Sequence, residues 1–399
     1  MKGRHVALLA AALCFLFFGL YTGDRFYYVF LFAEGLVCFA SLLHIVWVFT
    51  SFKYIQYLSA NIVQKGDTTR FSLELHNDTI IPYTCLKLHA RSAVEGEDLF
   101  IVTSLAPLDN TRYEFTLQCP FRGVREVGLV SITAGDIFGL FLIRLNMDIF
   151  SYHRMLPLVV YPKIISLPYP GFTDKGYSAS KGGGLFASDD PAAAAGHRKM
   201  VSGEPLSRIH WKLFARTRVL YVREYEDAIL PKVVLVIDAG VSALPVEETQ
   251  AAQDIICTAA ASLIHGFLSR GVPVTSVVIR AEKEIREYAR EKDMPLMLDY
   301  FARLRFDSGS DFISLLAAER FSSADSLYIL TANLTQKLFA YLGNIGAGRG
   351  DCRCLAIAGD EKQTAQIDGK YARVLRESGV RCIIMPPSGD LAKEAEKWK

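Results

Sequence analysis

Two long apolar runs at the start of the sequence constrain the fold more than any other feature. Val6–Tyr21 carries no charged residue, and Phe26–Phe52 contains only one acidic residue, Glu34, and one histidine, His44. A membrane-spanning helix needs about 20 apolar residues, because each residue adds 1.5 Å and the hydrocarbon layer is about 30 Å thick. The two runs therefore predict a transmembrane helical hairpin in residues 1–54, with spans at about 6–22 and 26–50.

A secretory signal peptide is the alternative interpretation of the first run. Gly19–Gly23 offers no small-x-small cleavage site, however, and a second apolar run follows at once, so we favour the hairpin. Cationic residues flank the outer ends of the two runs, namely Lys2, Arg4, Lys53 and Lys65. Because cytoplasmic flanks are enriched in Lys and Arg, this charge pattern predicts a two-pass membrane protein with both termini and the soluble domains in the cytoplasm.

Glu34 lies inside the second apolar run and has two interpretations. A carboxyl group in a bilayer is costly and by default indicates a functional site. Alternatively, Glu34 reaches the interface from near the start of a long span, or is protonated and hydrogen-bonded within the helix pair. We favour the second interpretation, because the sequence shows no other acidic residue in the spans that would form a relay.

The hydrophobic pattern changes its period after Tyr54. Phe71–His76 and Tyr113–Gln118 alternate strictly between apolar and polar residues, and turn sequences such as Lys65–Asp67 separate the alternating segments. Short alternating strands at this spacing are typical of an antiparallel sandwich. The sequence therefore predicts an all-β sandwich domain in residues 55–167. Residues 168–197 follow as a Gly/Ala-rich linker, and the Gly182–Gly184 triplet in it lacks the Lys-Ser/Thr that a phosphate-binding loop needs.

Apolar strands alternate with helical patterns from Lys232 onward. The expected strands are Val233–Asp238, Val274–Arg280, Leu327–Thr331, Cys354–Ala358 and Cys382–Met385. Near-continuous apolar strands joined by helical crossovers predict a doubly wound, mostly parallel α/β sheet. Any site in such a sheet lies beyond the carboxyl ends of the strands.

The carboxyl ends of these predicted strands resemble the metal-ion-dependent adhesion site of von Willebrand factor A domains. Asp238 and Ser242 match its first loop, and Ser310 stands for the threonine of its second. Gly240 replaces an expected hydroxyl, and no Asp follows Thr331. The resemblance implies a von Willebrand factor A-like, Rossmann-type α/β domain. Mg²⁺ prefers a near-octahedral set of oxygens, so the two lost ligands predict a degenerate site without bound metal or other cofactor.

A cluster of basic residues lies in the segment before the first buried strand. Arg208, Lys212 and Arg216 recur at every fourth residue, and this spacing predicts that they share one face of a helix in which Pro205 is in the first turn. That face has two interpretations, a binding surface for a carboxylate or phosphate or a solvated face paired with nearby glutamates. The candidate binding residues are Arg198, Arg208, Trp211, Lys212 and Arg216.

The same segment resembles the signature of the domain-of-unknown-function 58 family of bacterial membrane proteins. The matching positions are Arg198, Gly203, Arg208, Ile209, His210, Trp211, Lys212, Ala215, Arg216, Val222 and Glu224, while Met200 and Glu204 depart from the family's Tyr and Asp. Arg122-Gly123, Asp136–Phe141 and Val160–Pro162 resemble the end of the family's β-domain. The resemblance spans nearly the whole chain, and residues 198–399 correspond to its signature motif plus α/β domain. It implies a location in the bacterial cell membrane and partnership with a MoxR-type AAA+ ATPase and with other membrane proteins.

The net charge does not favour a nucleic-acid-binding protein, and the sequence lacks the common catalytic motifs that would indicate an enzyme. A net charge of +2 gives no large electrostatic attraction to a polyanion, so we expect no nucleic-acid partner. The sequence has no His-Glu-x-x-His, Cys-x-x-Cys or Gly-x-Ser-x-Gly motif, so we expect no catalysis. The prediction is a membrane-anchored interaction or scaffold module that works with the ATPase in the assembly or maturation of other proteins. A metal-dependent adhesion-type receptor and an enzyme of unrecognised type are the alternatives.

Overall fold

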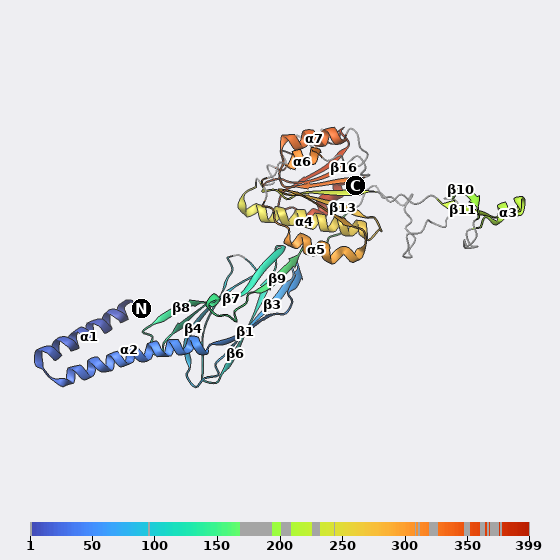
Figure 1. Cartoon of the computed structure of the whole chain (residues 1–399). Coiled ribbons are helices and arrows are strands. Elements are labelled where there is room, and N and C mark those ends of the chain that lie inside the picture. Colours follow the sequence, from blue (N-terminus) through green and yellow to red (C-terminus); the bar gives the residue numbers. More distant parts are fainter. Residues whose placement is uncertain are drawn as a thin grey trace. The chain divides into compact units, whose positions relative to one another are not determined.

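The chain forms two compact units, Met1–Lys163 and Ile164–Lys399, and each is described by itself (Figure 1). The computed structural model describes residues 2–94, 96–167, 194–200, 209–225, 232–242, 244–307, 309, 312–318, 326–346, 352–359, 364, 367, 375 and 377–398. Together the two units contain two apolar N-terminal helices, β-rich sheets and a mixed α/β region whose sheet is largely parallel. The finer division of the chain at residues 54 and 197 stays a prediction.

The two apolar runs form helices α1 (Lys2–Thr22) and α2 (Arg25–Ser51). Asp24 caps α2, since its carboxylate accepts a hydrogen bond of 3.1 Å from the Phe26 amide, and Gly23 supplies the positive φ of the tight turn. Both helices are long and apolar enough to cross a membrane, and their side chains are largely exposed. Large exposed apolar surface of this kind suggests a membrane anchor. A third helix, α4, also meets the length and composition limits, but it is buried inside the α/β region.

The last two turns of α2 pack into the β-rich region of the first unit. Ile45, Val48 and Phe49 recur at helical spacing and are buried together with Phe52 in the core of that region. His44 Nε2 donates a hydrogen bond of 3.0 Å to the Pro82 carbonyl at the same place. The helix therefore has an exposed apolar part and a part that belongs to the hydrophobic core.

The β-rich region contains two sheets that share one hydrophobic core. The smaller sheet has the order β1-β3-β6, and the larger has β2-β9-β7-β4-β5 with β8 paired to β7. The strands are β1 (Lys53–Leu58), β2 (Ile62–Gln64), β3 (Thr68–His76), β4 (Tyr83–Arg91), β5 (Leu99–Leu105), β6 (Asn110–Gln118), β7 (Gly123–Gly135), β8 (Leu142–Asn146) and β9 (Leu156–Tyr161). Leu73 of β3 and Leu88 of β4 face inward into the shared core, as strict alternation requires.

The sheet of the second unit has the order β14-β13-β12-β15-β16-β17. All neighbours are parallel except β13 and β14, which are antiparallel. Its strands are β12 (Val233–Asp238), β13 (Val274–Ile279), β14 (Lys283–Tyr288), β15 (Ser326–Thr331), β16 (Cys352–Ile357) and β17 (Val380–Met385). The sequence missed β14 because its run of charged residues suits an edge strand that has only one neighbour.

Helices cover both faces of this sheet, α4 and α5 on one face and α6 and α7 on the other (Figure 1). They are α4 (Val246–Leu268), α5 (Met294–Arg303), α6 (Phe312–Ala318) and α7 (Gln336–Gly346), with η4 (Glu291–Asp293) before α5 and α9 (Leu391–Glu394) and η6 (Ala395–Trp398) at the end. All six residues of β12 are buried, since Leu235 and Ile237 belong to one apolar cluster and Val234 and Val236 to the other. Burial on both faces explains why the sequence of β12 is an almost unbroken apolar run.

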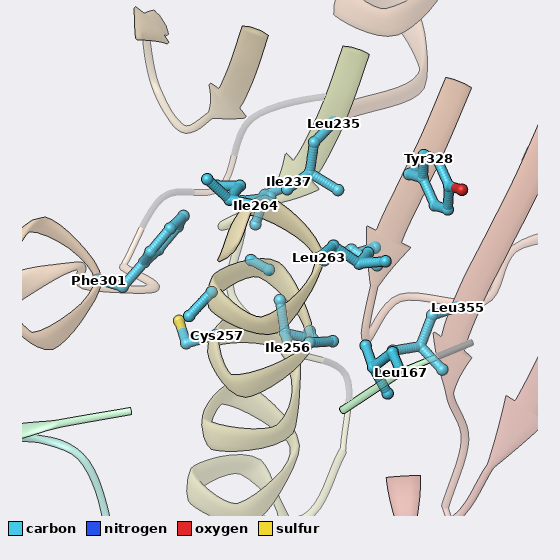
Figure 2. Close-up of a cluster of buried hydrophobic side chains, with 14 of the residues drawn as sticks. Leu167, Leu235, Ile237, Ile256, Cys257, Leu263, Ile264, Phe301, Tyr328 and Leu355 are labelled. Carbon is cyan, nitrogen blue, oxygen red and sulfur yellow. The ribbon is translucent and has the colours of Figure 1, made fainter. Parts of the chain in front are cut away.

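The larger cluster lies between α4 and the sheet, where side chains from several elements meet (Figure 2). Tyr328 of β15 lies between two aromatic rings, 5.6 Å from that of Phe267 and 5.9 Å from that of Trp398. The buried Arg353 donates a hydrogen bond of 2.8 Å to the Tyr328 hydroxyl, and Arg381 donates one of 2.7 Å to the Trp398 carbonyl. The last turn of the described chain is thus part of the core.

Candidate functional site

The strands β12 and β15 bring together the polar residues that end them. Ile237 of β12 lies opposite Leu330 of β15 in a parallel register, so the next residues, Asp238 and Thr331, are neighbours. Thr331 Oγ1 donates a hydrogen bond of 2.7 Å to Asp238 Oδ2, and Asn333 Nδ2 donates one of 3.2 Å to the same oxygen. Asp238 is only 2% exposed. The structure thus brings the polar residues at the ends of these two strands together.

The remaining oxygen of Asp238 is also used within the chain. Oδ1 accepts a hydrogen bond of 3.0 Å from the Gly240 amide, so both carboxylate oxygens face internal donors. Ser242 Oγ accepts a hydrogen bond of 3.1 Å from the Leu244 amide and is used in its own turn. Ser310 lies outside the described residues. Among the residues that the structure describes, no group of three His, Cys, Asp or Glu side chains is placed to hold a metal ion.

Replacing Asp238 by alanine is expected to destabilise the second unit by about 2–4 kcal/mol. The substitution leaves the hydroxyl of Thr331 and the amides of Asn333 and Gly240 without their acceptor in a site that water hardly reaches. Thermal unfolding of the full chain and hydrogen exchange of the amides in β12 and β15 measure the loss of stability. Asp307→Ala is the matched control, because its carboxylate is exposed and its pairing with Arg280 is screened by water, so we expect a much smaller change there. An Asp238 variant as stable as this control would contradict the prediction.

A second polar network connects β13, β14 and α5. Arg280, just after β13, contacts Asp307 Oδ1 at 2.9 Å through Nη2 and Glu284 Oε1 at 3.4 Å through Nη1. The hydrogen bond from Arg280 lowers the pKa of Asp307. Tyr300 donates a hydrogen bond of 2.8 Å to Glu284 Oε2, and burial followed by this bond raises the pKa of the Tyr300 phenol. The Arg286 guanidinium lies 4.0 Å from the centroid of the Tyr300 ring. These paired charges attach the edge strand and supply no nucleophile with an adjacent base.

The buried thiols of β16 have a partner that the sequence did not indicate. Cys354 lies opposite Cys382 of β17, and both belong with Cys352 to the apolar cluster on the α6 and α7 side. The hydrogen bond with Cys382, together with burial, raises the pKa of the Cys354 thiol well above its ordinary value. A protonated buried thiol is a poor nucleophile and a poor metal ligand. All eight cysteines are free.

The basic segment predicted as a binding surface forms a hairpin with a short helix. Strand β10 (Ala194–Lys199) pairs with β11 (Tyr221–Tyr225) in antiparallel register, and helix α3 (Trp211–Thr217) lies between them in sequence. Residues 194–197, which were predicted as part of the linker, belong to β10, and residues 168–193 lie outside the described residues. Residues 201–208, which include the candidate binding residue Arg208, also lie outside the described residues. Arg198 is on β10 opposite Val222.

Helix α3 begins later than the sequence predicted. Ile209 is bridged to Val222 as an extension of the hairpin, and His210 is the N-cap whose Nδ1 accepts a hydrogen bond of 3.0 Å from the Leu213 amide. Of the cations expected on one helix face, α3 therefore carries Lys212 and Arg216. Both are exposed, and they share a face because they are four residues apart.

Trp211 occupies the first position of α3 and is 56% exposed. Its ring packs edge to face against Phe214 with the centroids 6.1 Å apart, so the indole is held in place while much of it faces solvent. A large aromatic side chain that remains exposed beside two cations has the composition of a protein interaction surface. We call Trp211, Lys212 and Arg216 the α3 surface.

Comparisons with known proteins do not assign this chain to a family. No family model and no curated protein matches it. A solved β-glucosidase, EmGH1 from Erythrobacter marinus, is 20% identical and covers 24% of this chain and 15% of its own, with a TM-score of 0.15. Cwp6 from Clostridium difficile is 11% identical and covers 83% of this chain and 53% of its own, with a TM-score of 0.18. The chain spans about half or less of each protein's length, and at these TM-scores the likenesses carry no argument about fold or activity.

Proposed function

We propose that the protein is a membrane-anchored interaction module whose partner binds the α3 surface. The observation that carries this proposal is the exposure of Trp211 next to Lys212 and Arg216. Exposed tryptophan and arginine side chains dominate the binding energy of many protein interfaces. The polar groups at the strand ends, by contrast, are satisfied within the chain, and this supports a role in recognition in place of catalysis.

The proposed anchor is a two-pass hairpin of α1 and α2 in the bacterial cell membrane. The length and exposed apolar surface of the two helices support it. The flanking cations Arg4 and Lys53 support an orientation with both soluble regions in the cytoplasm. Glu34 then lies within a span as a single carboxyl group, which we interpret as having no role of its own.

The proposed fold assignments rest on the sheet arrangements. Two sheets that share one core support an immunoglobulin-sized β-sandwich in the first unit. The order β14-β13-β12-β15-β16-β17 with helices on both faces supports a Rossmann-type domain like that of von Willebrand factor A. Both are features that membership of the domain-of-unknown-function 58 family implies.

A MoxR-type AAA+ ATPase is the partner that we propose for the α3 surface. This choice comes from the resemblance of the signature motif, and with it comes a role in the assembly or maturation of other proteins. The protein itself would contribute binding and position, with no metal, cofactor or catalytic step. The paired state of Asp238 supports this assignment over a metal-dependent receptor, because its oxygens already accept hydrogen bonds.

Photocrosslinking in intact cells tests the proposal. A benzophenone amino acid replaces Trp211 in the full chain, and a matched probe replaces the exposed Val246 at the start of α4. We expect the probe at residue 211 to capture the ATPase and the probe at residue 246 not to capture it. The double substitution Lys212→Glu and Arg216→Glu should reduce the capture. Equal capture at both positions, or none at residue 211, would overturn the proposal.

A further inference from the structure

The turn between β7 and β8 presents two apolar side chains to solvent. Ile137 is 52% exposed and Phe138 is 54% exposed. The turn is nevertheless held firmly by Asp136, which is buried and accepts hydrogen bonds of 2.9 Å from the Phe138 amide and 2.6 Å from the Phe141 amide. Gly139 supplies a positive φ in the same turn. The exposure is therefore a fixed feature of the fold, and it needs an explanation.

The turn lies at the end of the β-rich region where the apolar helices meet it. Arg4 of α1 donates a hydrogen bond of 3.1 Å to the Gly139 carbonyl, and the His5 ring lies 5.7 Å from that of Phe141. Gly135, which precedes the turn, lies opposite Cys85 near the start of β4. The start of α1 and the turn are thus in direct contact.

The level of the turn along the helices matches the expected edge of a bilayer. Because α1 and α2 are antiparallel and joined at residues 23–24, Arg4 is level with roughly residue 43 of α2. From His44 onward, α2 enters the core of the β-rich region. The exposed part of α2, Arg25 to residue 43, is about 28 Å long at 1.5 Å per residue, which is close to the thickness of a hydrocarbon layer.

We propose that the surface formed by Ile137 and Phe138 docks on the phospholipid bilayer that α1 and α2 cross. Ile137 and Phe138 reach the boundary between headgroups and acyl chains. The inference rests on the proposed membrane anchor and adds a second, peripheral contact to it. Its consequence is that the β-rich region is held against the membrane surface on two sides, by α2 and by this turn.

An exposed aromatic side chain elsewhere in the same region provides a matched control. Phe100 of β5 is 75% exposed and lies opposite His89 of β4. Tyr83, at the other end of β4, donates a hydrogen bond to Ser51 of α2. Six residues of strand separate His89 from Tyr83, so Phe100 lies about 20 Å farther from the helices.

The test is photocrosslinking of the full chain in vesicles of phosphatidylethanolamine and phosphatidylglycerol. A benzophenone amino acid replaces Phe138, Phe100 or Phe32, the last being a 74% exposed residue in the apolar, exposed part of α2. We expect lipid adducts at residue 138 with a yield of the same order as at residue 32 and roughly ten times that at residue 100, as a side chain in the interface requires. A probe at Ile137 repeats the measurement if the variant at residue 138 does not fold.

The three positions separate the failure of this inference from the failure of the proposed anchor. Lipid adducts at residue 32 with no more adduct at residues 137 and 138 than at residue 100 would leave the anchor standing and overturn the docking surface. The absence of lipid adducts at residue 32 would overturn both. A protein–protein adduct at residue 138 in place of lipid would assign the turn to contact with a second copy of the chain, and would also overturn the inference.

Discussion

Trp398→Ala is expected to destabilise the second unit by about 3–5 kcal/mol, the range for removing a large aromatic side chain from a core. Trp398 is 1% exposed, and its ring packs against that of Tyr328, which in turn packs against Phe267. The substitution opens a cavity between the last turn of the described chain and the sheet. Hydrogen exchange of β15 and β16 in the full chain measures the loss, because it reports this unit separately from the first.

Trp211→Ala is the matched control for that measurement. It removes the same side chain from a position that is 56% exposed, so we expect a change in stability within about 0.5 kcal/mol. A Trp398 variant whose β15 and β16 exchange no faster than those of the Trp211 variant would contradict the described packing of the last turn. The pair also separates stability from recognition, because only the Trp211 variant should lose the proposed partner.

Removing residues 1–52 is expected to unfold or aggregate the β-rich region of the first unit. The deletion takes away Ile45, Val48, Phe49 and Phe52, all buried in the core that the two sheets share. Burial of each such side chain contributes about 1.5–3 kcal/mol, so their joint loss of about 6–12 kcal/mol is comparable with the whole stability of a domain. Hydrogen exchange of β3 and β4 in the truncated chain is the measurement.

A chain that starts at Ala40 is the matched control for this truncation. It lacks most of the exposed apolar surface of the hairpin but keeps the last turns of α2. We expect protected amides in β3 and β4 of this longer chain and little protection in the chain that starts at Lys53. Equal protection in the two chains would mean that the last turns of α2 contribute nothing to the core.

The sequence predicted those helices and strands whose hydrophobic pattern follows from one uniform degree of burial along the whole segment. Residues Val233–Asp238 are apolar throughout because β12 is buried on both faces, so an unbroken run identified it. Lys283–Tyr288 gave no such signal, because β14 lies at an edge and its charges pair with its neighbours. The apolar run of α2 also concealed a change of environment, since Phe32 is exposed and Ile45 is buried although both are apolar.

The sequence indicated which residues lie at the candidate sites. It did not indicate the hydrogen bonds and ring contacts that these residues make with residues distant in the sequence. The meeting of Asp238 with Thr331 and Asn333 follows from the parallel order of strands, which the alternation of strands and helices indicates. That both oxygens of Asp238 would accept internal hydrogen bonds does not follow from residue types. The role of Trp398 was also missed, because a tryptophan in a charged terminal segment gives no sign of the ring of Tyr328 that it covers.

The continuity of α2 has a mechanical consequence. The helix runs from Arg25 to Ser51 without a break, and Phe52 is buried just before β1 begins. No flexible linker therefore separates the exposed part of the helix from the sheets. A flexible tether would let the β-rich region tumble whatever the helices do. A continuous helix that ends in the core instead moves together with the sheets. In the proposed membrane anchor, a bilayer of different thickness that changes the tilt of α2 would therefore rotate the β-rich region by the same angle.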